Sequence, residues 1–296
     1  TNLSHDHLDY HGTLEAYLDA KLMLFDGRNN PRPAKRTTAV VNLDDPAAAR
    51  VCAAAAGAGH RVAGFGRSDA AAVRIVEVAM RADGLDLSLE EHGTRSAVRL
   101  ALLGGFNAWN AAGAFAAARA RGIPAPAAVR GLAGAPPVPG RLERIAEGQP
   151  FEVVVDYAHT PDALERALAA VREHACGRVL AVFGCGGDRD RAKRPVMGRV
   201  ARAGADEVWV TSDNPRSEDP AAIAAEIVAG AGGPVHLELD RREAIARALE
   251  AARSGDAVLI AGKGHETTQT IGDRVLPFDD REVARGLLRA RGGSRR

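Results

Sequence analysis

The chain has 296 residues and a nearly balanced charge, with 39 lysines and arginines against 38 aspartates and glutamates. This balance argues against a surface that binds nucleic acid or an anionic membrane as a whole, so any anion site must be local. A chain of this length can bury a substantial core and favours two domains, although one remains possible. The three cysteines, Cys52, Cys176 and Cys185, form no closely spaced pair, which disfavours a disulfide framework or a zinc ribbon.

The sequence has no feature that predicts export or membrane insertion. No apolar run approaches the roughly 20 residues that a membrane-spanning helix needs, and the N-terminus lacks the layout of a signal peptide. We therefore expect a cytoplasmic protein. The first residue is Thr1 rather than Met, and a dense polar segment follows it directly, so the chain is expected to be a truncated part of a longer protein.

The first helix in chain order is expected to begin after Thr13, a good N-cap residue, and to end at Phe25. One apolar face is predicted for it, made of Leu14, Tyr17, Leu18, Leu22 and Phe25. Lys21 fills the remaining position on that face. Burying an ammonium is costly, so a lysine there must snorkel, pair, lose its proton or be modified. The spacing leaves both snorkelling and a functional role open.

A polar segment precedes this helix and contains Asp6, His7 and Asp9. A histidine nitrogen together with carboxylate oxygens suits a divalent cation. A solvated turn is an equally good interpretation of the same residues.

Helical patterns and strand-like runs share the rest of the first half of the chain. Strands are expected at residues 38–43, 61–65, 73–78, 85–90 and 97–102. The last three alternate polar and apolar residues, as half-exposed antiparallel strands do. Prolines and glycines then crowd residues 124–140, where proline removes backbone donors and restricts φ. We place a domain boundary near Pro139, between domains at residues 1–138 and 139–296.

The second half predicts an α/β domain with a Rossmann-like, mostly parallel sheet. Apolar runs of strand length at 152–155, 179–183, 207–210, 235–239 and 257–261 alternate with alanine-rich helical stretches. Polar and glycine-rich segments follow four of these runs, at residues 156–159, 184–189, 211–216 and 262–266. Because ligands bind at the carboxyl ends of strands in open α/β sheets, these four segments predict one site.

The N-terminal segment resembles the central ATPase domain of the Mur ligases. The matching residues are Thr1-Asn2-Leu3-Ser4-His5-Asp6-His7-Leu8-Asp9-Tyr10-His11-Gly12, followed by Ala20-Lys21. In this family the lysine that matches Lys21 is carbamylated, and it binds Mg²⁺ together with the histidine that matches His7. A carbamate supplies the hard oxygen ligands that Mg²⁺ prefers, which an ammonium does not. The resemblance therefore implies a modified, functional Lys21.

In that family, a glycine-rich loop that cradles the ATP phosphates and a domain that grips a uridine nucleotide precede this segment. The pattern of such a loop, Gly-x-x-x-x-Gly-Lys-Ser/Thr, does not occur between Thr1 and Arg296. The resemblance therefore implies that these 296 residues alone lack ligase activity.

Contacts with ATP are also implied by the resemblance. The segment that contains Asn107 and Asn110 is similar to the family's adenine-binding stretch, Arg141 matches an arginine that reaches the phosphates, and Asp156 matches a residue near the ribose. An arginine suits phosphates because its charge is fixed and its donors are forked. Structural roles remain open, with Asn107 as a helix cap and Asp156 as a turn residue.

Residues 153–162, 183–190 and 261–266 resemble the C-terminal domain of the Mur ligases that form a tripeptide. Within that group, the segment Asp213-Asn214-Pro215-Arg216 accompanies meso-diaminopimelate as the added amino acid. Diaminopimelate differs from lysine mainly by a second carboxylate at its far end, which Arg216 can bind with two hydrogen bonds.

The remaining residues of the expected amino-acid pocket are also implied by this resemblance. Arg189 is expected to hold a substrate carboxylate, Asp213 and Asn214 to accept from its ammonium groups, and Gly262 and Glu266 to complete the pocket. Other interpretations are a solvated charge cluster around Arg189 and a weak phosphate-loop pattern at residues 262–264. Lys193 and Arg194 are expected to be surface charges.

The implied reaction is ATP-dependent addition of meso-diaminopimelate to UDP-N-acetylmuramoyl-L-alanyl-D-glutamate through an acyl phosphate. Positioning and electrostatic stabilisation, with Mg²⁺, would do most of the work, and no serine or cysteine nucleophile is required. His159 is a conceivable proton acceptor or an orienting residue. Three alternatives stay open: a ligase that adds lysine, a folylpolyglutamate synthetase, and a non-catalytic scaffold that binds nucleotide or amino acid.

Overall fold

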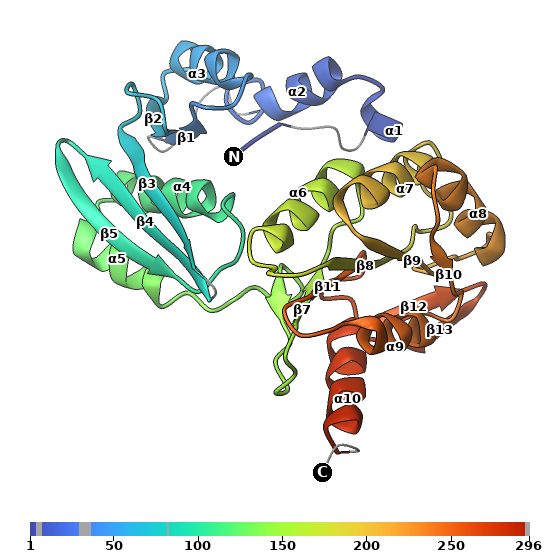
Figure 1. Cartoon of the computed structure of the whole chain (residues 1–296). Coiled ribbons are helices and arrows are strands. Elements are labelled where there is room, and N and C mark those ends of the chain that lie inside the picture. The colour runs from blue at the N-terminus through green and yellow to red at the C-terminus, as the bar shows by residue number, and fades with distance from the viewer. Residues whose placement is uncertain (4–7, 30–36, 82, 294–296) are drawn as a thin grey trace. The chain divides into compact units, whose positions relative to one another are not determined.

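The computed structural model describes residues 1–3, 8–29, 37–81 and 83–293, and it divides into two compact units, Thr1–Pro136 and Pro137–Arg296 (Figure 1). Each unit has its own sheet and its own hydrophobic core. His7 lies outside the described residues, so its predicted role as a metal ligand has no structural counterpart here.

The first unit is built on a mixed sheet in the order β1-β2-β3-β4-β5. Its strands are β1 (Thr38–Asn42), β2 (Arg61–Gly66), β3 (Val73–Arg81), β4 (Gly84–Glu91) and β5 (Thr94–Leu100). The first three are parallel to one another, whereas β4 pairs antiparallel with both β3 and β5. The predicted antiparallel arrangement of the last three runs is thus confirmed.

Helices complete the first unit: α1 (Leu8–His11), α2 (Leu14–Leu22), α3 (Ala48–Gly57), α4 (Asn107–Ala120) and α5 (Ala125–Ala133). Buried alanines of α4, such as Ala108 and Ala112, join Phe115 in one cluster with the apolar residues of β3, β4 and β5. Their small side chains allow the helix backbone to approach the sheet closely, which accounts for the alanine-rich pattern.

The prediction for the first helix is only partly correct. Thr13 caps α2, since its side chain accepts a hydrogen bond from the amide of Ala16 at 3.1 Å. The helix ends at Leu22 rather than at Phe25, and only Leu18 and Leu22 are buried along it. Leu14 is 45% exposed and Lys21 is also exposed, so the predicted apolar face is buried only in part, and the exposure of Lys21 agrees with the snorkelling alternative. A short helix that packs through two residues one turn apart buries a narrower stripe than the spacing predicts.

The second unit has a sheet in the order β10-β9-β8-β11-β7-β6. Its strands are β6 (Glu143–Arg144), β7 (Glu152–Asp156), β8 (Val179–Phe183), β9 (Glu207–Val210), β10 (His236–Leu237) and β11 (Ala257–Ala261). All of them run parallel except β6, which pairs antiparallel with β7. The predicted parallel sheet is therefore confirmed, although its edge strand β10 is shorter than expected.

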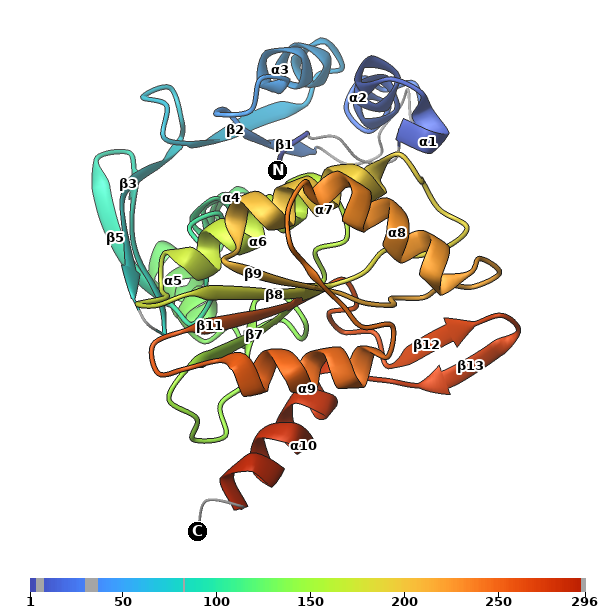
Figure 2. The ribbon, with the colours of Figure 1, turned by 45° about the vertical axis from the view of Figure 1, so that its right-hand side comes forward.

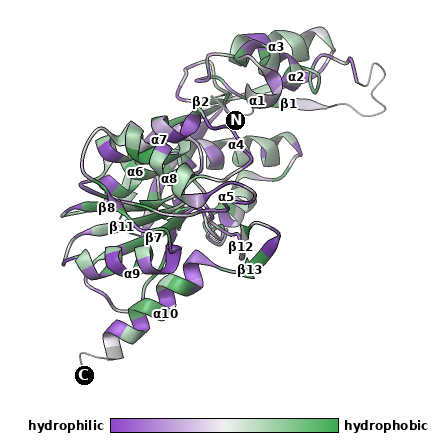
Figure 3. Ribbon diagram, turned by 90° about the vertical axis from the view of Figure 1, so that its right-hand side faces the viewer, coloured by the Kyte–Doolittle hydropathy of each residue, from purple (hydrophilic) through white to green (hydrophobic). Residues whose placement is uncertain are grey.

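Helices cover both faces of this second sheet (Figure 2). They are α6 (Pro161–Arg172), α7 (Lys193–Gly204) and α8 (Pro220–Ala231) on one face, and α9 (Arg241–Ala251) and α10 (Asp280–Gly293) on the other. The central strands β8 and β11 are buried along their whole length, which explains their continuous apolar sequences (Figure 3). A hairpin of β12 (Thr268–Ile271) and β13 (Arg274–Pro277) follows β11 and was not predicted.

None of the described helices has both the length and the apolar composition that crossing a membrane requires.

Candidate functional site

The polar segments after β7, β8, β9 and β11 meet at one edge of the second sheet. We call residues 156–159, 184–189, 211–216 and 262–266 the loop edge. Because the four strands are parallel neighbours, their carboxyl ends lie side by side. Glycines allow the segments to touch: a Cβ on Gly184 would lie 2.2 Å from the carbonyl oxygen of Thr211, and one on Gly264 would lie 2.6 Å from Tyr157 Cβ. The structure thus brings the predicted segments together.

Three side chains form a hydrogen-bonded cluster at the centre of the loop edge. The ammonium of Lys263 lies 3.1 Å from Asn214 Oδ1 and 3.2 Å from Glu266 Oε2. Asn214 Nδ2 donates to the same Glu266 oxygen at 2.9 Å. Lys263 is completely buried, so the weak phosphate-loop interpretation of residues 262–264 is wrong for this conformation.

Asp213 lies beside this cluster with its carboxylate held between two loops. The side chain is 8% exposed, and among the described residues no hydrogen bond to its carboxylate occurs. A Cβ on Gly262 would lie 2.6 Å from Asp213 Oδ2, and the φ of Gly262 is +117°, a conformation that favours glycine. Gly262 therefore leaves the space that the Asp213 carboxylate occupies.

A fully buried ion pair between Arg241 and Asp280 holds the same two loops from the interior of the unit. Arg241, at the start of α9, donates to both carboxylate oxygens of Asp280 at 2.8 and 2.7 Å. Its guanidinium also donates to the carbonyl oxygens of Ser212 at 3.2 Å and Ala261 at 2.9 Å, which precede Asp213 and Gly262. Sequence reasoning missed this pair, because one isolated arginine and one isolated aspartate carry no spacing signal.

Arg216 adopts a left-handed backbone conformation, with a φ of +52°. The hairpin holds it there: the amide of Arg216 donates to the carbonyl of Thr270 at 3.1 Å, and the amide of Gly272 donates to the carbonyl of Arg216 at 2.6 Å. One guanidinium nitrogen, Nη1, donates to the carbonyl of Gly187 at 2.7 Å. Non-glycine residues rarely adopt this conformation, and such residues concentrate at functional sites.

Arg141, Arg189 and Arg216 have no carboxylate partner among the described residues, as is also the case for exposed arginines of the second unit such as Arg199 and Arg242. Arg189 is exposed, with its guanidinium 3.4 Å from the carbonyl oxygen of Asp188. Arg216 is half-buried. These guanidinium groups therefore have N–H donors that remain available for an anion.

Arg194 differs from these arginines and from its prediction as a surface charge. It is completely buried and donates to Glu218 at 2.7 and 3.0 Å and to Glu226 at 3.1 Å. The hydrogen bond from Arg194, with help from the amide of Asp188, lowers the pKa of Glu218 to about 2. The surface-charge prediction is wrong because the bonds to Glu218 and Glu226 compensate for the burial of the guanidinium, although its Nε has no hydrogen-bond partner among the described residues.

Asp156 is almost buried at the end of β7, and two backbone amides hold its carboxylate. Leu142 donates to one oxygen and Ala158 to the other, both at 2.8 Å. Burial raises the pKa of Asp156, and the two amides partly oppose that increase. Arg141 lies nearby, with its guanidinium 4.6 Å from the centre of the Tyr157 ring. The predicted turn role of Asp156 is thus realised, and a ribose contact would use its remaining lone pairs.

His159 is oriented within the loop edge. Its Nδ1 lies 2.9 Å from the carbonyl oxygen of Tyr157, which makes Nδ1 the donor and leaves Nε2 as the basic nitrogen. The ammonium of Lys193 donates to the carbonyl of His159 at 2.9 Å. These contacts fit the orienting role, since they fix the backbone and the ring together.

The two candidate adenine contacts lie in the first unit. Asn107 begins α4, and its side-chain amide donates to the carbonyl of Leu103 at 2.7 Å, so it does not cap the helix with its side chain. Asn110, one turn further, donates to Asn107 Oδ1 at 2.9 Å. The two asparagines therefore form a small amide cluster at the start of α4.

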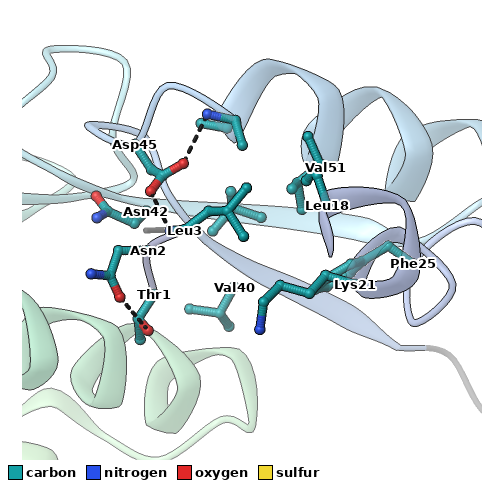
Figure 4. A pocket seen from close by; sticks show the side chains of 13 residues that line it. Thr1, Asn2, Leu3, Leu18, Lys21, Phe25, Val40, Asn42, Asp45 and Val51 are labelled. Carbon is teal, nitrogen blue, oxygen red and sulfur yellow. Dashed lines mark hydrogen bonds between the residues drawn. The ribbon is translucent and has the colours of Figure 1, made fainter. Parts of the chain in front are cut away.

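Lys21 lines a pocket of the first unit together with Phe25, Val40, Asn42 and Asp45, and Figure 4 shows its side chain extending from α2 along that pocket. Its ammonium lies 4.5 Å from the centre of the Tyr17 ring. Both carboxylate oxygens of Asp45 already accept from backbone amides. Within the described residues, no three His, Cys, Asp or Glu side chains gather as a metal site.

Family models match both units. Residues 1–118 match the Mur ligase middle domain, and residues 140–264 match the Mur ligase glutamate ligase domain. The chain therefore belongs to the Mur ligase family.

Individual relatives narrow this similarity. The chain is 46% identical over 297 residues to the UDP-N-acetylmuramoyl-L-alanyl-D-glutamate--2,6-diaminopimelate ligase of Geobacillus kaustophilus, covering 99% of the chain and 60% of the relative. It is 50% identical over 286 residues to the ligase of the same name from Alkalilimnicola ehrlichii, covering 96% of the chain and 56% of the relative. The chain thus spans about 60% of the length of such relatives.

Solved structures agree with the family. A structure of a UDP-N-acetylmuramoyl-L-alanyl-D-glutamate--2,6-diaminopimelate ligase matches with a TM-score of 0.64 and 40% identity, covering 98% of this chain and 59% of that one. A MurF ligase from Thermotoga maritima in complex with ADP matches with a TM-score of 0.72 at 19% identity, covering 100% and 62% of the two chains, which shows a shared fold only.

Proposed function

We propose that the protein containing this chain is an ATP-dependent ligase that adds meso-2,6-diaminopimelate to UDP-N-acetylmuramoyl-L-alanyl-D-glutamate, in cytoplasmic peptidoglycan precursor synthesis. The observation that carries the proposal is the placement of Arg216 and Arg189 on the same loop edge as Asp213 and Glu266. Cationic donors and anionic acceptors together complement an amino acid that has carboxylates and ammonium groups at both ends. The named relatives support the same assignment.

Arg216 is the proposed determinant of the added amino acid. Its guanidinium is fixed on one side by the carbonyl of Gly187, and its other N–H groups are proposed to bind the far carboxylate of diaminopimelate. Arg189 is proposed to bind the other carboxylate. Lysine has no far carboxylate and would leave Arg216 without an anion in a closed pocket, which disfavours lysine as the substrate.

Asp213 and Glu266 are proposed to hold the ammonium groups, with Pro215 and Gly262 shaping the pocket. Pro215 is buried between Asn214 and Arg216, where its fixed φ restricts the segment. The side chain of Asn214 takes a different part from the one expected. Because Asn214 Oδ1 already accepts from Lys263 and from the amide of Thr270, its remaining N–H is proposed to donate to a substrate carboxylate.

ATP is the proposed co-substrate, with Asn107 and Asn110 near adenine, Asp156 near the ribose, and Arg141 at the phosphates. The γ-phosphoryl group would pass to the terminal carboxylate of the dipeptide, and the amine of diaminopimelate would displace phosphate from the resulting acyl phosphate. Arg141 can stabilise phosphate charge, since no described carboxylate is hydrogen-bonded to its guanidinium. His159 is proposed to orient the loop rather than to carry a proton.

Mg²⁺ is proposed to bind the oxygens of a carbamate on Lys21 together with His7, where it would neutralise phosphate charge. Lys21 fits this modification because its amine is exposed at a pocket and lies within the first unit without a carboxylate partner among the described residues.

Calorimetric titration of residues 1–296 with meso-diaminopimelate and with L-lysine tests the proposal. We expect saturable binding of diaminopimelate and at least about tenfold weaker binding of lysine, since one charge-assisted carboxylate contact is lost. Equal affinity for the two amino acids would support a lysine-adding ligase instead. Binding of neither would support a scaffold without an amino-acid site.

A further inference from the structure

We infer that Lys263 is a positioning residue that gives the loop edge its selectivity for an ammonium-bearing ligand, by fixing the directions in which Asn214 and Glu266 face the pocket. The inference rests on the proposed function, because it assigns a specificity role within the same amino-acid site. Lys263 is completely buried, so it acts through its neighbours rather than by touching the substrate.

The position of Lys263 is defined by charge and by hydrogen bonds. Its ammonium lies 3.1 Å from Asn214 Oδ1 and 3.2 Å from Glu266 Oε2, so both buried contacts are made to acceptors. A buried ammonium without such partners would be strongly unfavourable. Moving Lys263 toward a ligand would leave Asn214 and Glu266 without this donor, so the structure favours a fixed lysine.

Lys263 fixes the orientation of the Asn214 amide. Asn214 Oδ1 accepts from Lys263 and also from the backbone amide of Thr270 at 3.0 Å. In the opposite orientation, the NH₂ group of Asn214 would face two donors, which is strongly disfavoured. The NH₂ group must therefore point at Glu266 Oε2, where it donates at 2.9 Å.

As a result, the two carboxylate oxygens of Glu266 have different surroundings. Oε2 accepts from both Lys263 and Asn214, whereas Oε1 has no hydrogen bond to a described residue. The side chain is 33% exposed, so Glu266 remains accessible to a ligand. Two fixed donors on Oε2 hold the carboxylate plane, and Oε1 is thereby presented as an acceptor for a ligand ammonium.

Without Lys263, both neighbours lose their orientation. Asn214 keeps only the amide of Thr270 on Oδ1, and Glu266 keeps a single donor on Oε2. The carboxylate then rotates more freely, and holding it in the bound orientation carries an entropic cost. Lys263 therefore acts on recognition of the ammonium through Glu266, whereas any weakening of the carboxylate contact of Asn214 affects ligands that share both carboxylates to the same extent.

The test compares meso-diaminopimelate with 2-aminopimelate, which keeps both carboxylates and lacks one ammonium group. Calorimetry on residues 1–296 would give the ratio of the two dissociation constants for the wild type, Lys263→Met, Glu266→Gln and the double variant. We expect a ratio of about tenfold or more in the wild type, in the range of a lost charge-assisted hydrogen bond. The ratio should fall below about threefold in Lys263→Met and in Glu266→Gln, with no further fall in the double variant.

The results separate the inference from the proposed function on which it rests. If the wild type binds neither ligand, both are overturned; if it binds diaminopimelate and Lys263→Met keeps the full ratio, only the inference is overturned. A merely structural lysine would weaken both ligands equally and would act to the same extent in the Glu266→Gln background. Should Lys263→Met fail to fold, Lys263→Leu, which also lacks an N–H donor, replaces it in the same cycle.

Discussion

The loop edge of the second unit and the surroundings of Lys21 in the first unit differ in how tightly the structure holds their polar groups. At the loop edge, Lys263, Asn214 and Glu266 are bound to one another, and Arg241 with Asp280 anchors the loops from the interior. Lys21 is exposed and its ammonium contacts the Tyr17 ring. Interior hydrogen bonds thus hold the polar groups of the loop edge in fixed positions, whereas the proposed role of Lys21 depends on a modification and on ligands.

The largest expected effect is the loss of stability when the buried ion pair between Arg241 and Asp280 is broken. Arg241→Ala leaves the Asp280 carboxylate buried without its partner, which is expected to lower the free energy of unfolding by about 3–5 kcal/mol. Denaturant unfolding would be followed by the fluorescence of Trp209, in a Trp109→Phe background that reports on the second unit. The exposed neighbour Arg242→Ala is the control and should change stability by less than about 0.5 kcal/mol. Similar losses in both variants would contradict the anchoring role.

Gly262→Ala is expected to have the next largest effect. The new Cβ would approach the Asp213 carboxylate, and a positive φ strains alanine, so the free energy of unfolding should fall by about 1–3 kcal/mol. Affinity for meso-diaminopimelate should fall about tenfold or more, as Asp213 is displaced. Gly286→Ala lies in α10 with no atom within 4 Å of the added Cβ, so it is the matched control. Unchanged affinity in Gly262→Ala would exclude the proposed part of Asp213 in binding.

Glu218 pairs with the buried Arg194 and accepts a hydrogen bond from the amide of Asp188 in the loop edge. The pH dependence of stability tests how much this pairing contributes. The pKa of Glu218 is lowered from 4.5 to about 2 by Arg194, so the charged carboxylate stabilises the folded state. For a lowered pKa this stabilisation is present above pH 4.5 and is lost as the pH falls toward 2. Glu218→Gln should therefore flatten the profile of the free energy of unfolding against pH in that window. A profile that matches the wild type would show that another group causes the acid sensitivity.

The smallest stability effect is expected at Lys21. Because the side chain is exposed, Lys21→Ala should change the free energy of unfolding by less than about 0.5 kcal/mol. The proposed carbamate would nevertheless disappear, and ¹³C NMR after equilibration with labelled bicarbonate would detect that loss. Lys35→Ala is the control and should keep the carbamate signal. A signal that survives Lys21→Ala would assign the modification to another lysine.

The sequence predicted the loop edge well because parallel strand topology converts position along the chain into position in space. Once residues 152–155, 179–183, 207–210 and 257–261 were assigned to parallel strands, the segments after them had to share one edge. The apolar runs are continuous because both faces of the sheet are covered, which made these strands easy to find.

Strand topology could not predict which charged side chains are buried and paired in the interior. Lys263 and Arg194 have charged side chains in polar segments, and nothing in their local pattern distinguishes a buried, paired cation from an exposed one. Burial there depends on acceptors distant in the chain, such as Asn214 for Lys263 and Glu226 for Arg194. The hairpin of β12 and β13 was missed because its strands have four residues each and lie largely outside the hydrophobic core.

Around Lys21, the apolar face predicted from helical spacing was wider than the stripe that is buried in the structure. Helical spacing placed Lys21 on an apolar face, but the spacing cannot show how wide a stripe the neighbouring elements cover. Leu18 and Leu22 suffice to attach α2, so Leu14 and Lys21 remain exposed. The family resemblance, rather than burial, therefore carries the proposed role of Lys21.

The central claim is that Arg216 selects an amino acid with a far carboxylate, and calorimetry on Arg216→Ala tests it most directly. The measured quantity is the ratio of the dissociation constants for L-lysine and meso-diaminopimelate, with Arg199→Ala, an exposed arginine of α7, as the control. We predict a ratio of about tenfold or more in the wild type and in the control, and a ratio close to one in Arg216→Ala. An unchanged ratio in Arg216→Ala would contradict the account.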